Sequence, residues 1–276
     1  MNTLRRHYPE YLMEAAGLGI FMISAAVVAT FLSHPDSPVR QAISEPLLRR
    51  ALMGLLMGFT AISLIYSPWG KQSGAHFNPA VTFTFFRLGK VKALDAFFYI
   101  IAQFIGGLLG LLVAGKFLGQ AITHPAINYI VTTPGRGGAI IAFIAEIIIS
   151  FGMMLMVLFV SNNPKLGKYT GIFSGMLIAT YITVEAPLSG MSMNPSRTMI
   201  SAIHAQIFSA IWVYLTAPII GMLLAAEIYV RLMGKNAVKC AKLHHHNNKR
   251  CIFCCGYRQQ MLRDGKWLLS DRLPHT

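Results

Sequence analysis

The chain has 276 residues, of which 54% are hydrophobic and only 12% are charged, and its mean hydropathy is +0.53. Soluble domains carry about 25% charged residues, so this composition excludes an ordinary soluble protein and indicates a polytopic membrane protein. The net charge of +14 does not favour a nucleic-acid-binding protein, because the basic residues cluster between apolar segments, as they do beside membrane spans.

Six apolar segments are close to the length that crosses a bilayer, which is about 20 residues of helix. The first follows the basic residues Arg5 and Arg6 and contains Glu14. It is longer than the apolar core of a signal peptide, so we expect it to be a retained span. The six expected spans are residues 11–32, 50–66, 93–117, 139–160, 169–186 and 207–233.

Two polar segments interrupt this series, at residues 71–89 and 188–205. Each is too short to cross the membrane as a helix, and each contains an Asn-Pro pair, Asn78-Pro79 in the first and Asn194-Pro195 in the second. Asn is a favoured N-cap and Pro is favoured at the first helical position, so each pair predicts the start of a short half-helix. The non-helical backbone before it is tolerated at membrane depth only where it lines a cavity.

The two interruptions repeat each other. "GAHFNPAVT" at 74–82 and "GMSMNPSRT" at 190–198 share Gly, Asn, Pro and Thr at an offset of 116 residues, and Glu14 and Glu146 lie early in equivalent spans. Three spans separate equivalent points, so the second half enters the membrane inverted and the half-helices meet at the midplane, N-terminus to N-terminus. The sequence therefore predicts an all-α membrane protein with six transmembrane helices and two re-entrant half-helices around a polar pore.

These residues resemble the aquaporin and glycerol-facilitator family, the major intrinsic proteins. "SGAHFNPAVT" (73–82) and "SMNPSRT" (192–198) are close to the family's two signature motifs, although Ser196 stands where the family usually has Ala. The resemblance, over roughly residues 8–233, implies a homotetramer in which each subunit has one passive pore for water or small neutral solutes. It implies no cofactor, and the sequence contains no nucleophile–base pair, phosphate loop or dinucleotide fingerprint that would favour an enzyme.

The resemblance also implies roles for individual residues. Asn78 and Asn194 would donate amide hydrogen bonds to the permeant at the pore centre, and Glu14 and Glu146 would brace the entering loops by accepting backbone hydrogen bonds. A proton-coupled transporter that uses these two acids is the alternative, because acids inside a membrane are functional suspects. We expect His76 to be a constitutive pore or loop contact, with a titrating gate as the alternative.

Four positions at the outer mouth set selectivity in this family. Arg197, Met191 and Ile182 occupy three of them by position. A gapless count places Gly58 at the fourth, whereas a longer connection after the second span would place Met57 there. Strict water channels generally have His where this chain has Ile182, so we expect a pore that also admits a glycerol- or urea-like solute. A strict water channel is the alternative.

Lys and Arg set the expected orientation in the cell membrane. With both termini cytoplasmic, most of them lie inside, and the outer side holds only Arg40, Arg49, Arg50, Lys116 and Arg136. The expected division is a cytoplasmic N-terminus (1–10), a channel domain (11–233, with inverted halves of about 11–117 and 139–233) and a basic cytoplasmic tail (234–276).

The tail contains all four cysteines of the chain and three consecutive histidines. A Cys-x2-Cys pair with a nearby His and a further Cys is compatible with a tetrahedral zinc site, whose candidate ligands are Cys240, His245, Cys251 and Cys254. The alternative is a basic segment with free or lipidated thiols that is attracted to anionic lipid.

Overall fold

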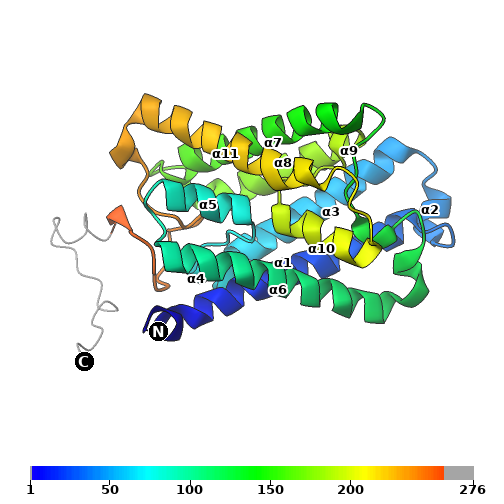
Figure 1. Ribbon diagram of the computed structural model, residues 1–276, viewed down its shortest axis with the longest axis horizontal. Helices are drawn as coiled ribbons and strands as arrows, with labels where there is room; N and C mark the ends of the chain where they lie inside the picture. The colour runs from blue at the N-terminus through cyan, green and yellow to red at the C-terminus, as the bar shows by residue number, and fades with distance from the viewer. Residues whose placement is uncertain (1, 258–276) are drawn as a thin grey trace.

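The computed structural model describes residues 2–257, and within them the regular structure is entirely helical. Figure 1 shows long helices lying side by side along one direction, with two short helices between them. The long helices are α1 (Asn2–Ser33), α3 (Pro46–Tyr66), α6 (Ala93–Leu118), α7 (Gly138–Ser161), α8 (Thr170–Val184) and α11 (Ile211–Met233). The short ones are α2 (Pro38–Ala42), α4 (Pro68–Ser73), α5 (Pro79–Arg87), α9 (Ala186–Ser189) and α10 (Pro195–Ala205).

All six expected spans correspond to long helices. Five of them, all except α8, are long and apolar enough to cross a membrane. Helix α8 has only 15 residues, but the 3-10 turn Gly167–Tyr169 directly precedes it and α9 follows one residue after its end. This continuous helical path brings the fifth span to the length that a bilayer requires.

The boundaries differ most from the expected ones at three helix starts, one of which is that of α3, at Pro46 rather than near residue 50. Helix α1 begins at Asn2, so most of the expected separate N-terminal segment (residues 1–10) is part of the first helix. The last long helix begins at Ile211 rather than near residue 207. Gln206 and Ala210 both adopt left-handed backbone conformations, with φ of 55° and 49°, which separates α11 from the preceding half-helix.

Equivalent helices of the two halves make equivalent contacts. Helix α1 packs against α6 and α7 against α11, while α3 packs against α8 across the boundary between the halves. Small residues allow the close approach, since a Cβ on Gly106 would lie 2.0 Å from the Ala15 carbonyl oxygen and one on Gly58 would lie 2.5 Å from that of Gly175. The half-helices α5 and α10 enter from opposite ends of the bundle and meet near its middle, which confirms the predicted inverted fold (Figure 1).

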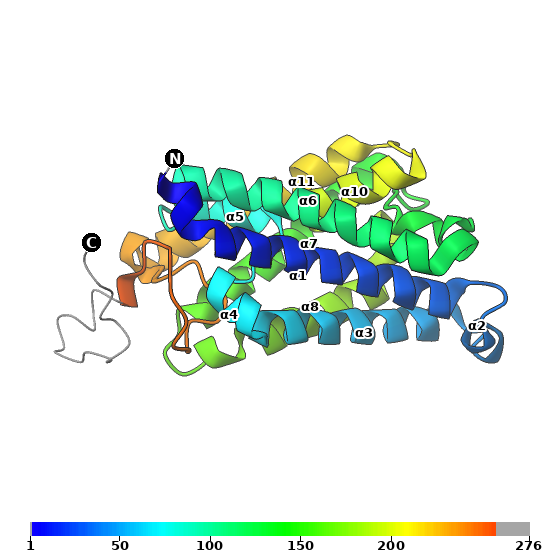
Figure 2. The same cartoon turned by 90° about the horizontal axis from the view of Figure 1, so that it is seen from below.

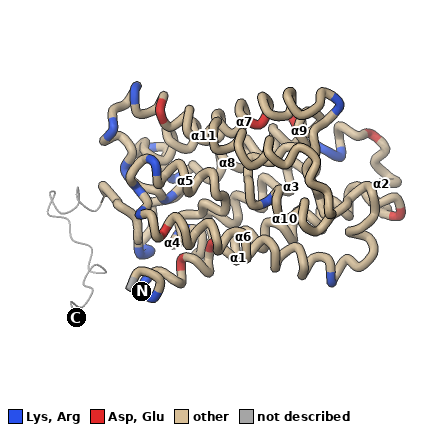
Figure 3. Tube along the Cα trace, viewed as in Figure 1, with Lys and Arg blue, Asp and Glu red and all other residues tan. Residues whose placement is uncertain are grey.

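Both described chain ends lie at one end of the bundle, here called the tail face, where α1 begins and residues 234–257 lie (Figures 1 and 2). The other end, with α2 and the connection after α6, is the opposite face. Lys and Arg gather mainly at the tail face, as Figure 3 shows. Residues 258–276 of the expected tail lie outside the described residues.

Candidate functional site

The backbone before each half-helix follows the same path in both halves. Gly74 and Gly190 are left-handed, with φ of 99° and 83°, and they end the short helices α4 and α9. Phe77 and Met193 also have positive φ, 48° and 53°, although they are not glycines. Such conformations are uncommon for residues with a Cβ and persist where surrounding contacts fix them.

Glu14 supplies these contacts for the first loop. Its carboxylate accepts hydrogen bonds from the Ser73 hydroxyl at 2.7 Å and from the backbone N–H groups of His76 at 3.1 Å and Phe77 at 2.6 Å. The amide of Gln103 donates a fourth bond at 2.9 Å. The side chain of Glu14 is fully buried, so its charge is compensated by donors of the loop that it holds.

Glu146 does the same for the second loop. It accepts hydrogen bonds from the Ser189 hydroxyl and the Ser192 N–H, both at 2.7 Å, and from the Met193 N–H at 2.8 Å. Glu146 is also fully buried. Both acids therefore sit behind the loops and engage their backbone, which is the geometry that a bracing role requires.

Asn78 and Asn194 cap the two half-helices and connect them. The side-chain oxygen of Asn78 accepts from the Ala80 N–H, and that of Asn194 accepts from the Ser196 and Arg197 N–H groups. Pro79 and Pro195 occupy the first helical positions, where the missing N–H costs nothing.

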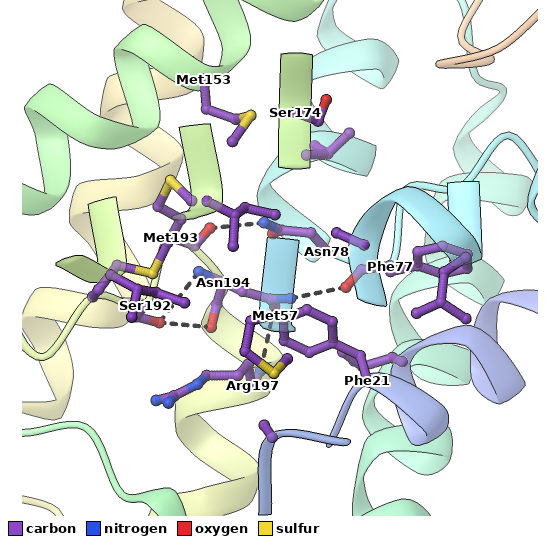
Figure 4. Close-up of a pocket in the computed structure, with 18 of the residues that line it drawn as sticks. Phe21, Met57, Phe77, Asn78, Met153, Ser174, Ser192, Met193, Asn194 and Arg197 are labelled. Atoms are coloured by element: carbon purple, nitrogen blue, oxygen red, sulfur yellow. Dashed lines mark hydrogen bonds between the residues drawn. The ribbon is translucent and has the colours of Figure 1, made fainter. Parts of the chain in front are cut away.

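The amide nitrogens of the two caps point across the centre of the molecule. The Asn78 amide donates to the Met193 carbonyl at 2.7 Å, and the Asn194 amide donates to the Phe77 carbonyl at 2.8 Å (Figure 4). These bonds tie each half-helix to the opposite loop. Each amide carries two hydrogens, so one N–H of each Asn remains for a molecule in the cavity.

A cavity of about 300 Å³ passes these two side chains. Its lining includes Arg50 and Arg197 toward the opposite face, Asn78 and Asn194 in the middle, and Leu243 at the tail face. Figure 4 shows Arg197 on one side of the paired Asn residues and Met153 and Ser174 on the other. The Nη1 atom of Arg197 is buried and has no hydrogen-bond partner within residues 2–257. The residue as a whole is only partly buried and lines the cavity, so its guanidinium group can face a permeant.

Three of the predicted selectivity residues, Arg197, Met191 and Ile182, line this cavity. At the fourth position the lining residue is Met57, and Gly58 is not part of the lining. Gly58 instead contacts Gly175 on α8, where a Cβ would clash with the backbone. The assignment of Gly58 to the pore is therefore corrected to Met57, because the adjacent helical residue points to a different face.

His76 is fixed by contacts on both ring nitrogens. Nδ1 lies 3.1 Å from the Thr82 hydroxyl, and Nε2 lies 2.8 Å from the Ala241 carbonyl oxygen. The ring stacks between those of Phe85 and Phe253. His76 thus lines the cavity and is at the same time a loop contact.

Two equivalent contacts were missed by the sequence analysis. The hydroxyls of Tyr99 and Tyr214 donate to the carbonyls of Ser73 and Ser189 at 2.7 and 2.6 Å, so each re-entrant loop is held by an equivalent tyrosine. The two tyrosines are 115 residues apart, one fewer than the offset of the Asn-Pro motifs, so an alignment of the halves that allows a one-residue shift would have paired them.

The candidate ligands of the tail are only partly those predicted. Cys240, His245, Cys251 and Cys255 have ligand atoms that all lie within 4.8 Å of one another. Cys254 is exposed and lies outside this group. The backbone of Cys254 is bound to the Lys90 carbonyl at 3.0 Å, and in this irregular segment the next residue, Cys255, turns toward the other thiols.

The chain is similar in sequence and in fold to known proteins. A family model described as "Major intrinsic protein" matches residues 7–229. The Probable aquaporin NIP-type of Nicotiana alata is 38% identical over 174 residues, which are 62% of this chain and 62% of that protein. Aquaporin NIP2-3 of Zea mays is 32% identical over 228 residues, which are 82% of this chain and 73% of that protein.

A solved structure has the same fold. The X-ray structure of the aquaglyceroporin from Plasmodium falciparum superposes with a TM-score of 0.69 at 22% sequence identity. The match covers 84% of this chain and 98% of that chain.

Proposed function

Because the chain belongs to the major intrinsic protein family, we propose that it forms a passive membrane channel for water and small neutral solutes. The observation that carries this proposal is the pair of Asn caps, which meet in the middle of a continuous cavity. Their free amide hydrogens replace hydrogen bonds that a solute gives up to enter. The positive ends of the two half-helix dipoles face the same point and disfavour cations and protons there.

The outer mouth favours an amphipathic solute in addition to water. Arg197 provides a fixed positive charge and a hydrogen-bond donor, while Ile182, Met191 and Met57 provide apolar walls. A glycerol- or urea-like molecule can place its polar groups against Arg197 and its carbon atoms against these walls. Methionine side chains are flexible and can adjust to solutes of different size.

The geometry favours this passive channel over a proton-coupled transporter or an enzyme. A transported proton needs an acid that faces the permeation path. Glu14 and Glu146 are not among the residues that line the cavity, and both carboxylates accept hydrogen bonds from the loops. No step in the proposed function requires a cofactor or a covalent intermediate.

We propose a homotetramer in the cell membrane, with both termini on the cytoplasmic side. Large apolar side chains such as Leu55, Phe117 and Ile140 are exposed on the long helices and suit contact with lipid or a second subunit. The concentration of Lys and Arg at the tail face supports a cytoplasmic location for that face (Figure 3).

A solute panel tests this function. Proteoliposomes containing the full chain are mixed with impermeant sugar, glycerol or urea in a stopped-flow instrument, and volume changes are followed by light scattering. We expect faster equilibration of water and of glycerol or urea than in protein-free liposomes, with rates that a pH gradient does not alter. Solute uptake that requires a pH gradient would favour the transporter, and water flux alone would favour a strict water channel.

A further inference from the structure

The segment after α11 carries a cluster of soft metal ligands on the tail face. The Cys240 and Cys251 sulfurs are 3.6 Å apart, and the Cys255 sulfur is 3.0 Å from Nε2 of His245. A tetrahedral Zn²⁺ with Zn–S bonds of about 2.3 Å and a Zn–N bond of about 2.0 Å separates two sulfurs by about 3.8 Å and sulfur from nitrogen by about 3.5 Å. The four ligand atoms, all within 4.8 Å of one another, are thus arranged within reach of one ion.

We propose that Cys240, His245, Cys251 and Cys255 bind one Zn²⁺ ion, which fixes the tail segment at the tail-face mouth of the pore. Three thiolates and one imidazole form a ligand set that zinc takes in closed structural sites. The ring of Tyr257 packs on that of His245, with centroids 4.5 Å apart, and thereby restricts the orientation of the imidazole.

The charge around the cluster suits this ligand set. Zinc with three thiolates and a neutral imidazole has a net charge of −1. Lys242 lies two residues after Cys240, and its side chain is buried. It is also held in place, because it donates to the carbonyls of Lys249 and Arg250 at 3.1 and 2.7 Å. A buried cation beside the cluster therefore offsets the negative charge of the metal complex.

The ligands bracket the part of the tail that reaches the pore. The Leu243 N–H donates to the Gly74 carbonyl at 3.1 Å, and Leu243 lines the cavity. The Ala241 carbonyl accepts a hydrogen bond from His76, and Phe253 stacks on the His76 ring at 5.4 Å between centroids. Residues 240–255, visible in orange beside α5 in Figure 1, contain no regular helix or strand that would hold these contacts in register.

One ion pair anchors the same segment to α1. Arg250 donates to both oxygens of the buried Glu10 carboxylate, which raises the pKa of Arg250. A metal that joins Cys240, His245, Cys251 and Cys255 would close the loop between these positions. It would thereby reduce the conformational freedom that the segment has when it is detached from the bundle. Zinc would thus complete the attachment of the tail to the first re-entrant loop.

The test uses the purified full chain, reduced and then loaded with Co²⁺ in place of Zn²⁺. We expect thiolate charge-transfer absorbance, visible bands of tetrahedral cobalt and one metal per chain, with both sets of bands displaced by Zn²⁺. Cys255→Ser should lose these signals, whereas Cys254→Ser should keep them. Cys254 is a matched control because it is the adjacent cysteine, is exposed and lies outside the cluster.

Limited trypsin digestion gives a second readout that does not depend on the pore. Cleavage after the exposed Lys249 should slow by up to about 100-fold when free zinc is about 100 times its Kd. The Cys255→Ser chain should be cleaved at the same rate with and without zinc. Absence of the cobalt bands under reducing conditions would overturn the site, and so would equal loss of signal in Cys254→Ser and Cys255→Ser. Either result is independent of whether the protein conducts solutes.

Discussion

The two re-entrant loops have the same frame but different surroundings. In both, a left-handed glycine follows a serine, a buried glutamate accepts the loop's N–H groups, a tyrosine binds the serine carbonyl and an asparagine caps the half-helix. Equivalent threonines, Thr82 and Thr198, bind the side chains at positions 76 and 192. The features that the halves share are those that hold irregular backbone inside the bundle.

The features that differ face the two mouths. Arg197 of the second loop corresponds to Val81 of the first, so a charged side chain lines only one end of the cavity at this position. His76 corresponds to Ser192, and His76 contacts the tail through Ala241. On the second loop, Thr198 instead lies 3.4 Å from Thr132 of the connection between the halves. The repeat therefore builds the frame, and departures from the repeat give each mouth its own chemistry.

Replacing either cap by leucine should break the shared frame and have the largest effect on flux. Asn78→Leu and Asn194→Leu each remove a helix cap, worth about 1 kcal/mol, and a cross-bond between the halves, worth about 1 kcal/mol. They also place an apolar group in the centre of the cavity. We expect water and solute flux in proteoliposomes to fall to the protein-free level in both variants.

The two leucine variants also compare the halves. Asn194 caps both Ser196 and Arg197, whereas Asn78 caps Ala80 alone, so Asn194→Leu should additionally displace Arg197. Equal reconstitution and helix content, measured by protein assay and circular dichroism, serve as controls. Unchanged flux in either variant, with the assembly intact, would contradict the placement of the pore.

The repeated frame was accessible from sequence, because its chemistry is local. Asn followed by Pro favours a helix start. Asn163-Pro164 lies in a turn instead, so it is the repetition of two such pairs at a fixed offset, each in an equivalent polar interruption, that defines the inverted fold. The lining of the cavity toward the opposite face was less accessible, since Met57 and Gly58 are neighbours in one helix and a single extra residue in a connection exchanges them. The cavity lining, which includes Met57, and the packing of Gly58 on Gly175 distinguish the two.

The tail was the least accessible part. Its cysteines and histidines predict a metal site. The segment lacks helical or strand periodicity, however, so the residue spacing does not define which thiols lie close together. Cys255 rather than Cys254 completes the cluster because backbone contacts with Lys90 and Lys239 set the path of the chain there. The contact of Leu243 with the re-entrant loop also joins residues far apart in sequence, and no local pattern encodes it.

Substitutions at the opposite-face end of the cavity should sharpen the contrast between the two ends without abolishing flux. Ile182→His adds a polar group to the apolar wall, and Met191→Ala enlarges the opening. We expect the glycerol-to-water permeability ratio to fall in Ile182→His and to rise in Met191→Ala, each by several-fold, since a difference of about 1 kcal/mol in one barrier changes a ratio about fivefold. Stopped-flow light scattering measures both permeabilities in the same vesicles.

The equivalent change at the other mouth provides the matched control for selectivity. Leu243→Ala enlarges the tail-face end of the cavity, where no charged side chain stands opposite it in the way that Arg197 does. It should alter both permeabilities in proportion and leave their ratio nearly unchanged. A ratio that responds to Leu243→Ala but not to Ile182→His or Met191→Ala would place the selective constriction at the tail face instead.

The smallest expected effect tests whether the two tyrosines are equivalent. Tyr99→Phe and Tyr214→Phe each remove one buried hydroxyl and its bond to a loop carbonyl, while both rings remain in place. A lost hydrogen bond of this kind costs about 1 kcal/mol, which lowers Tm by about 2–4 °C in a chain of this size. We expect similar shifts for the two variants in thermal unfolding of the detergent-solubilised protein, with flux close to that of the unaltered chain. Tyr8→Phe, at an exposed tyrosine, should leave Tm unchanged. A much larger shift for Tyr99→Phe alone would mean that the first loop depends on its tyrosine in a way that the second does not, and the halves would then not share one frame.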